Sequence, residues 1–191
     1  KKIFSNIFSF SAGEYEGRQS AFTEKTINEV VRASYEMGEV KTGALIVIEQ
    51  NVALGEYVRT GITIDGLVTS QLLINIFEHN TPLHDGAVII RGNRIVSATC
   101  YLPLTDSMDI GKELGTRHRA AVGISEVSDS LTIIVSEETG AVSLAKDGRL
   151  YKHLQKEELV EKLQQLKVDD TGNADVFKKW KDLLRNEKSE K

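Results

Sequence analysis

The chain has 191 residues, of which 40% are hydrophobic and 27% charged, and its formal net charge is −4 at pH 7. This size and balance fit one globular domain with appendages, and the acidic excess argues against non-specific nucleic-acid binding, which needs a basic surface. The lone Cys100 excludes an internal disulfide and, at the end of an apolar run, is expected to be a small buried hydrophobe.

The N-terminal ten residues combine two lysines with several large apolar side chains. This pattern fits a terminal arm packed on the core, or equally a membrane-proximal stub cut from a longer protein with its lysines on the cytoplasmic side. Residues 11–19, rich in Gly, Ser and charge, are expected to form a loop. No segment of the sequence is apolar enough to span a bilayer.

Helix and strand patterns then alternate. Apolar spacing predicts a helix over 23–37, and Thr26 with Glu29 three residues on resembles a capping box, so the helix could begin at Thr23 or Thr26. The continuous apolar run 44–49 predicts a strand buried on both faces. A short strand over 62–64 and a helix over 70–78 follow.

Asn80 and Pro82 end that helix, so a loop is expected before the next strand, 87–91. Gly92 and Asn93 predict a tight hairpin to a strand over 94–99. The remaining pattern predicts a helix from about Thr116, a hairpin of strands 131–136 and 141–145, a turn at 147–148, and amphipathic segments 154–166 and 176–184, the latter with Trp180. Strands in hairpins and helical crossovers together predict an α/β fold with a mixed central β-sheet flanked by helices.

The loop before residue 87 brings His84 and Asp85 next to the small pair Gly86 and Ala87. A carboxylate beside an imidazole suits a divalent metal or a proton, and the small pair lets a ligand approach the backbone. An Asp-Gly turn is also common without any function.

The run Thr116, Arg117, His118 and Arg119 follows Gly115 at a predicted helix start. Helix N-termini attract anions and normally carry acidic residues, so two arginines there are unfavourable unless an anion binds. The alternative to an anion site is a charged turn that is simply solvated and binds no ligand. Arginines suit phosphate oxygens, so we expect a phosphate site on an acidic body.

Two further segments could border such a site. The turn 136–140 carries two carboxylates, one of which could help to hold a cation, and Tyr101 with Leu102 could form an adenine slot or simply lie in the core. The sequence lacks a Walker pattern, a dinucleotide glycine fingerprint, a zinc-type cluster and a Gly-x-Ser-x-Gly elbow.

Asp85-Gly86-Ala87 and Arg117-His118-Arg119 resemble the two signature motifs of the diadenylate cyclase domain. The sequence around these motifs is similar to that family over about residues 20–150. The chain most resembles the membrane-anchored members of Gram-positive bacteria. The resemblance implies a juxtamembrane stub and loop (1–19) and a catalytic domain (20–150). It says little about residues 151–191, for which the amphipathic pattern alone predicts a C-terminal helical extension.

In that family two ATP are condensed into cyclic di-AMP with release of two pyrophosphates. The resemblance implies catalytic roles for Asp85, Arg117 and Arg119, and a divalent cation (Mn²⁺, Mg²⁺ or Co²⁺) on Asp85, His84 and Glu138. The predicted ATP contacts are Gly86, Ala87, Tyr101, Leu102, Thr116, Arg117, His118, Arg119, Ser136 and Glu137.

The resemblance further implies a face-to-face homodimer for catalysis and a place on the cytoplasmic face of the cell membrane, reached through an N-terminal segment that this chain lacks. Its implied regulators are a phosphoglucosamine mutase and a YbbR-repeat protein. Two alternatives stay open. A catalytically dead nucleotide sensor would keep the arginines but could dispense with Asp85, and a metal-dependent phosphodiesterase would want more clustered His and Asp ligands.

Overall fold

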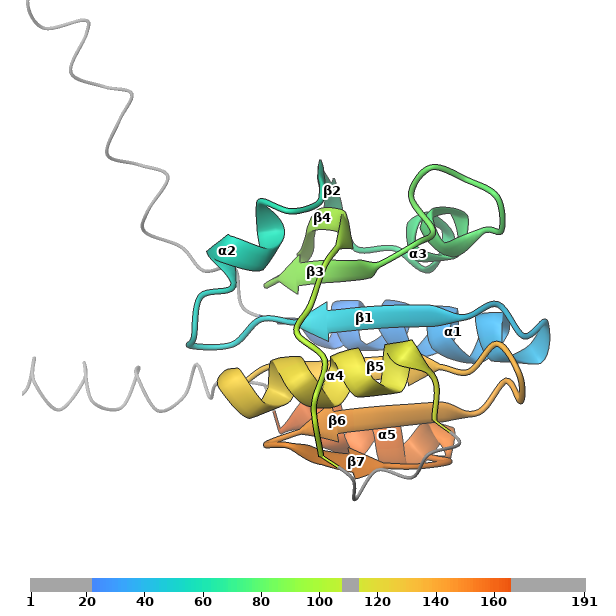
Figure 1. The fold of residues 1–191 in the computed structure, drawn as a ribbon. Helices are drawn as coiled ribbons and strands as arrows, with labels where there is room; N and C mark the ends of the chain where they lie inside the picture. Colours follow the sequence, from blue (N-terminus) through green and yellow to red (C-terminus); the bar gives the residue numbers. More distant parts are fainter. Residues whose placement is uncertain (1–21, 108–113, 166–191) are drawn as a thin grey trace, which may run out of the picture.

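The computed structural model describes residues 22–107 and 114–165 (Figure 1). The predicted stub and loop (1–19) and the predicted segment 176–184 therefore lie outside the described residues. The elements, in chain order, are α1 (Glu24–Glu39), β1 (Ala44–Ile48), α2 (Gly55–Val58), β2 (Ile62–Leu67), α3 (Ser70–Phe77), β3 (Ala87–Arg91), β4 (Arg94–Cys100), α4 (Thr116–Val127), β5 (Leu131–Val135), β6 (Val142–Lys146), β7 (Arg149–Tyr151) and α5 (Lys156–Gln164).

The strands form one mixed sheet in the order β2-β4-β3-β1-β5-β6-β7. β1 and β3 run parallel, while the other neighbouring strands pair antiparallel. The mixed α/β fold predicted from the sequence is therefore confirmed. β2 is longer than the predicted 62–64, and the short elements α2 and β7 had no counterpart among the predicted elements.

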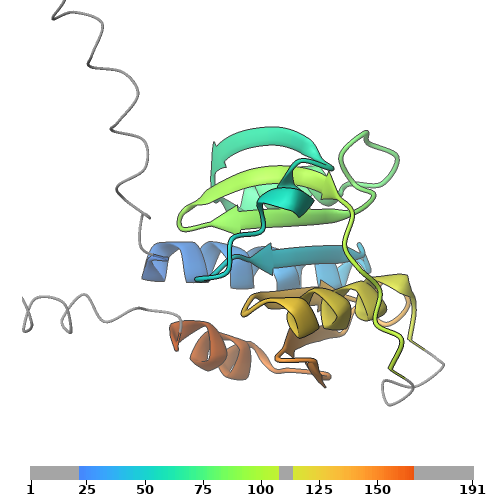
Figure 2. The ribbon, with the colours of Figure 1, turned by 60° about the vertical axis from the view of Figure 1, so that its left-hand side comes forward.

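Helices cover both faces of the sheet, with α1 and α4 on opposite sides (Figures 1 and 2). Alternate residues of β1 divide between two apolar clusters. Ile46 packs in the cluster that includes α1, α3 and α5, whereas Val47 packs in the cluster that includes α4. All five residues of β1 are buried, as the continuous apolar run predicted, because helices cover the strand on each side.

The start of α1 is set by Thr23, whose side chain accepts a hydrogen bond from the Thr26 backbone N–H. The suggested capping box of Thr26 and Glu29 is wrong. The Glu29 carboxylate instead accepts the backbone N–H of Ser70, at 2.6 Å, and this bond lowers the pKa of Glu29. Glu29 thus joins α1 to the first turn of α3.

Residues beyond 150 also contribute to the core. α5 buries Leu159 and Leu163 in the same cluster as α1, and Tyr35 of α1 donates its hydroxyl to the Leu154 carbonyl at 2.8 Å. Across the described ranges, no helix combines the length and the apolar character that a bilayer crossing requires.

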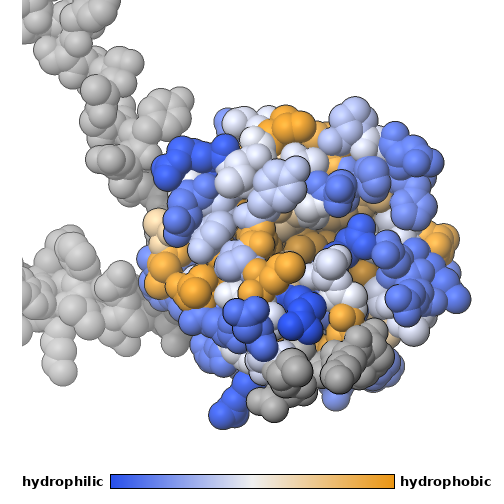
Figure 3. Space-filling model, viewed as in Figure 1, coloured by the Kyte–Doolittle hydropathy of each residue, from blue (hydrophilic) through white to orange (hydrophobic). Residues whose placement is uncertain are grey.

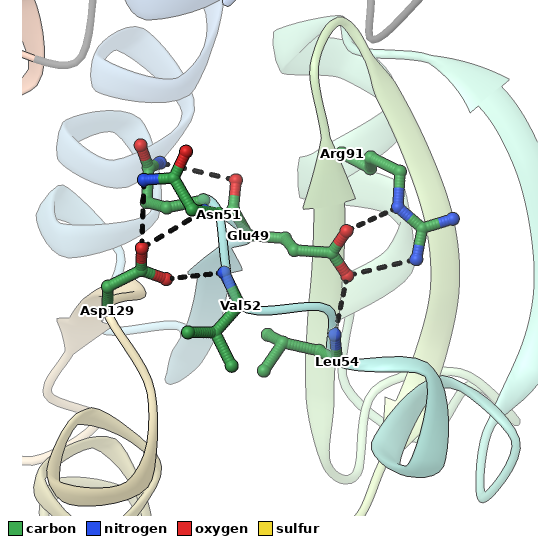
Figure 4. A network of polar contacts seen from close by, with 7 residues as sticks. Glu49, Asn51, Val52, Leu54, Arg91 and Asp129 are labelled. Atoms are coloured by element: carbon green, nitrogen blue, oxygen red, sulfur yellow. Dashed lines mark hydrogen bonds and ion pairs between the residues drawn. The ribbon is translucent and has the colours of Figure 1, made fainter. Parts of the chain in front are cut away.

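Two carboxylates fix the loop that follows β1 (Figure 4). Glu49, whose side chain is 3% exposed, accepts from Arg91 at 2.5 and 2.9 Å and from the Leu54 backbone N–H at 3.0 Å. Asp129 accepts from the backbone N–H groups of Asn51 and Val52. These bonds hold the loop between β1 and α2 at the edge of the sheet where β1 and β3 end.

The face seen in Figure 1 carries apolar surface along its middle within a more polar surround (Figure 3). Tyr101 and Leu104 are among the large apolar residues that are exposed, with 72% and 54% of their surface accessible. Both belong to the segment that follows β4.

Candidate nucleotide-binding site

The two predicted motifs lie near the edge of the sheet at which β1 and β3 begin. Ile46 pairs with Val88 in the parallel register, and Ala44 pairs with Val135 in the antiparallel one. Asp85 just before β3 and Ser136 just after β5 therefore lie at the same edge, with the start of β1 between them. The loop before β3, the segment before β1 and the turn after β5 therefore meet at this edge of the sheet, which is here called the shelf.

On one side of the shelf, Asp85 is exposed and Gly86 is tightly constrained. Gly86 has φ +115°, and a Cβ there would lie 2.8 Å from the Thr99 backbone. A glycine is therefore required, by backbone conformation and by the close approach of β4. The His84 ring Nδ1 lies 2.6 Å from the Thr81 carbonyl. Because a carbonyl only accepts, Nδ1 is the donor in this contact, and in the neutral form of the ring Nε2 is then the acceptor.

On the other side, α4 begins directly at Thr116. Its N-cap residue is Gly115, which offers no side-chain hydrogen bond, and its first turn contains no acidic residue. The positive end of the helix dipole is thus left without a negative side chain of its own, a setting that favours a bound anion. The two arginines at this helix start are therefore electrostatically unfavourable unless an anion binds there, as the sequence predicts.

A pocket of about 270 Å³ opens beside this helix start. It gathers six predicted site residues: Thr116, Arg117, His118, Ser136, Glu137 and Glu138. The rest of its lining is Leu114, Gly115, Val135, Thr139, Ala141, Ser143, Lys152 and His153.

Charge in the pocket is arranged around Arg117 and His118. Arg117 Nη1 lies 2.6 Å from Glu137 Oε2, with the two side chains 24% and 51% exposed. A Cβ at Gly43 would lie 3.0 Å from both of these atoms, so the absence of a side chain there makes room for the pair. Burial lowers the pKa of His118, the charge of Lys152 lowers it further, and Glu138 opposes this shift.

The remaining predicted nucleotide contacts lie outside the pocket lining. Ala87 is fully buried at the start of β3, Leu102 is half-buried, and the exposure of Tyr101 excludes the alternative that it is a core residue. Arg119, although two residues from Arg117, does not line the pocket: its Nη2 donates to the Thr105 carbonyl at 3.0 Å. The structure thus separates the two arginines of the motif.

The three predicted metal ligands are likewise not gathered together. Within 22–107 and 114–165, no group of three or more His, Cys, Asp or Glu side chains is placed to hold a metal ion. His84 and Asp85 adjoin β3, whereas Glu138 lies in the turn after β5. Cys100 is buried as expected, and burial raises the pKa of its thiol, which disfavours the reactive thiolate.

Sequence reasoning missed Gly43 as a site residue, and also Lys152 and His153, which follow β7 and line the pocket. A basic pair directly after a strand is the signal that the sequence offered for the latter two. Their position beside His118 depends on how the β6–β7 hairpin folds back, which local pattern does not reveal.

Comparison with known proteins adds an independent line of evidence. The family model described as DisA bacterial checkpoint controller nucleotide-binding matches residues 31–150. The chain is 58% identical over 141 residues to the cyclic di-AMP synthase CdaA of Bacillus subtilis, covering 74% of this chain and 52% of that protein. It is 48% identical over 177 residues to a diadenylate cyclase of Listeria monocytogenes, covering 92% and 63%.

A crystal structure of a double mutant of DacA from Staphylococcus aureus superposes with a TM-score of 0.74 at 50% identity, covering 76% of this chain and 97% of that one. The chain spans between half and two thirds of the length of the two curated relatives above. The family model covers more than half of the chain and agrees with these relatives. The chain therefore belongs to the diadenylate cyclase family.

Proposed function

We propose that this chain is a catalytic domain that condenses two ATP into cyclic di-AMP, a nucleotidyltransferase reaction. The observation that carries the proposal is the shelf itself: an exposed carboxylate, Asp85, lies at the same sheet edge as the pocket of Thr116, Arg117 and His118. The names of its relatives, cyclic di-AMP synthase and diadenylate cyclase, support the same reaction.

In this proposal the chain binds triphosphate at the start of α4. Arg117 neutralises phosphate oxygens, and Thr116 and His118 add hydrogen bonds beside the positive helix end. In the unliganded pocket burial and then Lys152 lower the pKa of His118, and a triphosphate bound beside the ring would act in the opposite direction, because negative charge favours the protonated imidazole. Phosphoryl transfer depends mainly on such positioning and electrostatic stabilisation.

Asp85 is the proposed base and metal ligand for the attacking 3′-hydroxyl. The donor chemistry fits a divalent cation, because the Thr81 carbonyl leaves His84 Nε2 as the free acceptor, the arrangement common among metal-binding histidines. We propose that His84 and Asp85 hold the cation; Glu138, in the turn after β5, is not grouped with them in the described part of the chain and is left out of this set. A bound Mn²⁺, Mg²⁺ or Co²⁺ would acidify the hydroxyl and offset developing charge.

Catalysis is proposed to need two copies of the domain. The product is nearly two-fold symmetric, and the chain carries one copy of each motif, so two identical sites meeting about a two-fold axis would complete the reaction. Membrane attachment through a segment before residue 1, and regulation by a phosphoglucosamine mutase and a YbbR-repeat protein, remain proposals from the resemblance.

The test is to incubate the chain with ATP and Mn²⁺ and to identify the product by mass spectrometry. Cyclic di-AMP with pyrophosphate is the expected result. Saturable ATP binding without any product under each of the three cations would overturn the proposal in favour of a nucleotide sensor, and hydrolysis of added cyclic dinucleotide alone would indicate a phosphodiesterase.

A further inference from the structure

The segment 101–107, here called the strap, connects the two halves of the shelf. It begins where β4 ends, since Cys100 pairs with Ala87 at the start of β3. It then passes over α4 (Figure 1). Its first residue is tied to the segment after α2, because the Tyr101 backbone N–H donates to Thr60 Oγ1 at 2.9 Å. Tyr101 and Leu102 thus start beside Asp85 and lead onto the helix that carries Arg117.

The seat of the strap on α4 is centred on Thr105, which is 2% exposed. Its backbone N–H donates to the Arg119 carbonyl at 3.1 Å, and its own carbonyl accepts from Arg119 Nη2 at 3.0 Å. Its hydroxyl donates to Glu126 Oε1 at 2.6 Å. Each polar group of Thr105 is therefore bound by α4, and Arg119 supplies two of these three bonds.

The same face of α4 is shaped to receive the strap. Gly123 follows Arg119 by four residues, which puts both on one side of the helix. A Cβ at Gly123 would overlap the Pro103 carbonyl oxygen. The strap therefore depends on two separate features of α4: the guanidinium of Arg119 and the missing side chain of Gly123.

Helix geometry explains why the two arginines act differently. Residues two apart on an α-helix point about 200° from one another. Arg117 consequently lines the pocket and pairs with Glu137, while Arg119 faces the strap. Two arginines that appear equivalent in the sequence have different partners in the fold.

We propose that Arg119 is a positioning residue, which holds the strap so that Tyr101 and Leu102 form the wall against the nucleobase, while Arg117 binds phosphate. The inference rests on the proposed ATP-dependent function and departs from the phosphate-binding role that the family resemblance implies for Arg119. It separates recognition of the base, through the strap, from recognition of the triphosphate, through the pocket.

The experiment measures binding of two probes to the full chain by titration calorimetry: ATP and inorganic tripolyphosphate, each with Mg²⁺. Arg117→Ala should weaken both probes by at least about tenfold, the loss of a charge-assisted hydrogen bond. Arg119→Ala removes the guanidinium bond to the Thr105 carbonyl and keeps the backbone bond from Thr105 to residue 119. It should weaken ATP about three- to tenfold and leave tripolyphosphate affinity within about twofold. The ratio of the two affinities is the readout, because general destabilisation does not change it selectively.

Gly123→Ala provides a second test, in which the strap is disturbed without the loss of a charge. It should displace the strap and reproduce the selective loss of ATP affinity, with tripolyphosphate binding retained. If it does not fold, as judged by circular dichroism, Thr105→Val takes its place, since it removes the bond to Glu126 and keeps the backbone bonds to Arg119. An equal loss of both probes in Arg119→Ala, or no loss of either, overturns the inference. Failure of the unsubstituted chain to bind ATP overturns the proposed function as well.

Discussion

Arg117 and Glu137 form an ion pair within the lining of the pocket, with Nη1 and Oε2 2.6 Å apart. Both side chains are partly exposed, so the pair itself contributes at most about 1 kcal/mol. Hydrogen bonds from arginine to phosphate are worth roughly 1.5–3 kcal/mol. A bound triphosphate can therefore displace the Glu137 carboxylate from its ion pair with the Arg117 guanidinium.

Replacement of this carboxylate by an amide should strengthen ATP binding. In Glu137→Gln the competing negative charge is removed and Arg117 is left in place, so affinity should rise by up to about fivefold, which corresponds to the worth of an exposed ion pair. Titration calorimetry measures the change, with Glu161→Gln on α5, which packs against α1 on the other face of the sheet, as the matched control. A marked loss of affinity would instead show that Glu137 is itself a ligand for the nucleotide or its cation.

Asp85→Asn should abolish formation of the cyclic product while ATP affinity stays within roughly tenfold, or 1.4 kcal/mol. The amide keeps the shape of an exposed side chain but cannot act as a base and is a poorer metal ligand, so the loss falls on the transition state. Product mass and ATP binding, measured on the same preparation, check this. Substantial turnover by the variant would contradict the role assigned to Asp85.

The half-buried ring of His118 predicts a pH dependence of stability. Burial, then Lys152, place its pKa below the ordinary 6.5, with Glu138 opposing and His153 reinforcing the shift. The folded state therefore binds a proton less readily than the unfolded state, so stability is complete above about 6.5 and falls as the pH drops toward the folded-state pKa. Urea unfolding between pH 7.5 and 5.5 should show a steeper loss for the wild type than for His118→Gln, and parallel curves would refute the assignment.

At the opposite edge of the sheet, Arg91 and Glu49 give a prediction about stability alone. Arg91→Met leaves the Glu49 carboxylate, 3% exposed, without its guanidinium, and should lower the free energy of unfolding by about 1.5–3 kcal/mol. Glu49→Gln can still accept the Leu54 N–H and should cost less. Chemical denaturation of both variants tests this order, and ATP affinity, measured beside it, should not change because the pair lies away from the pocket.

Strong local patterns were enough to predict most of the sheet and the main helices. The run 44–49 predicted β1, observed at Ala44–Ile48, because a strand covered on both faces must be apolar throughout. α2 escaped prediction because Gly55–Val58 has no buried residue and no side-chain cap, so nothing in its sequence marks it. Local spacing predicts a capping box for Glu29, but its actual partner, Ser70, is 41 residues away.

Some residues of the site can likewise be predicted from local sequence, whereas others depend on the tertiary fold. The motif around Arg117 was identified because arginines at a helix start need an electrostatic explanation, and the pocket lies there. The sequence could not distinguish Arg117 from Arg119, since the distinction depends on which side of α4 receives the strap. Lys152 and His153 reach the pocket only through the fold of the β6–β7 hairpin.

The near two-fold symmetry of the product sets the number of domains that one turnover requires. If each ATP supplies a 3′-hydroxyl from one domain and an α-phosphate to the other, one chain with one set of motifs cannot close the ring alone. Two domains must then meet face to face. Pairing that is not assisted by tethering to a common surface depends on protein concentration, as mass action requires.

Specific activity should therefore fall when the chain is diluted at saturating ATP and metal. The measurement is product formed per domain over a wide dilution series, with light scattering on the same samples to report the oligomeric state. A chemically cross-linked dimer cannot serve as the only check, because two chains joined back to back would leave both sites facing outward and inactive. Constant activity per domain down to concentrations at which scattering detects monomer alone would refute the two-domain mechanism, because a single shelf would then be sufficient for both bond-forming steps.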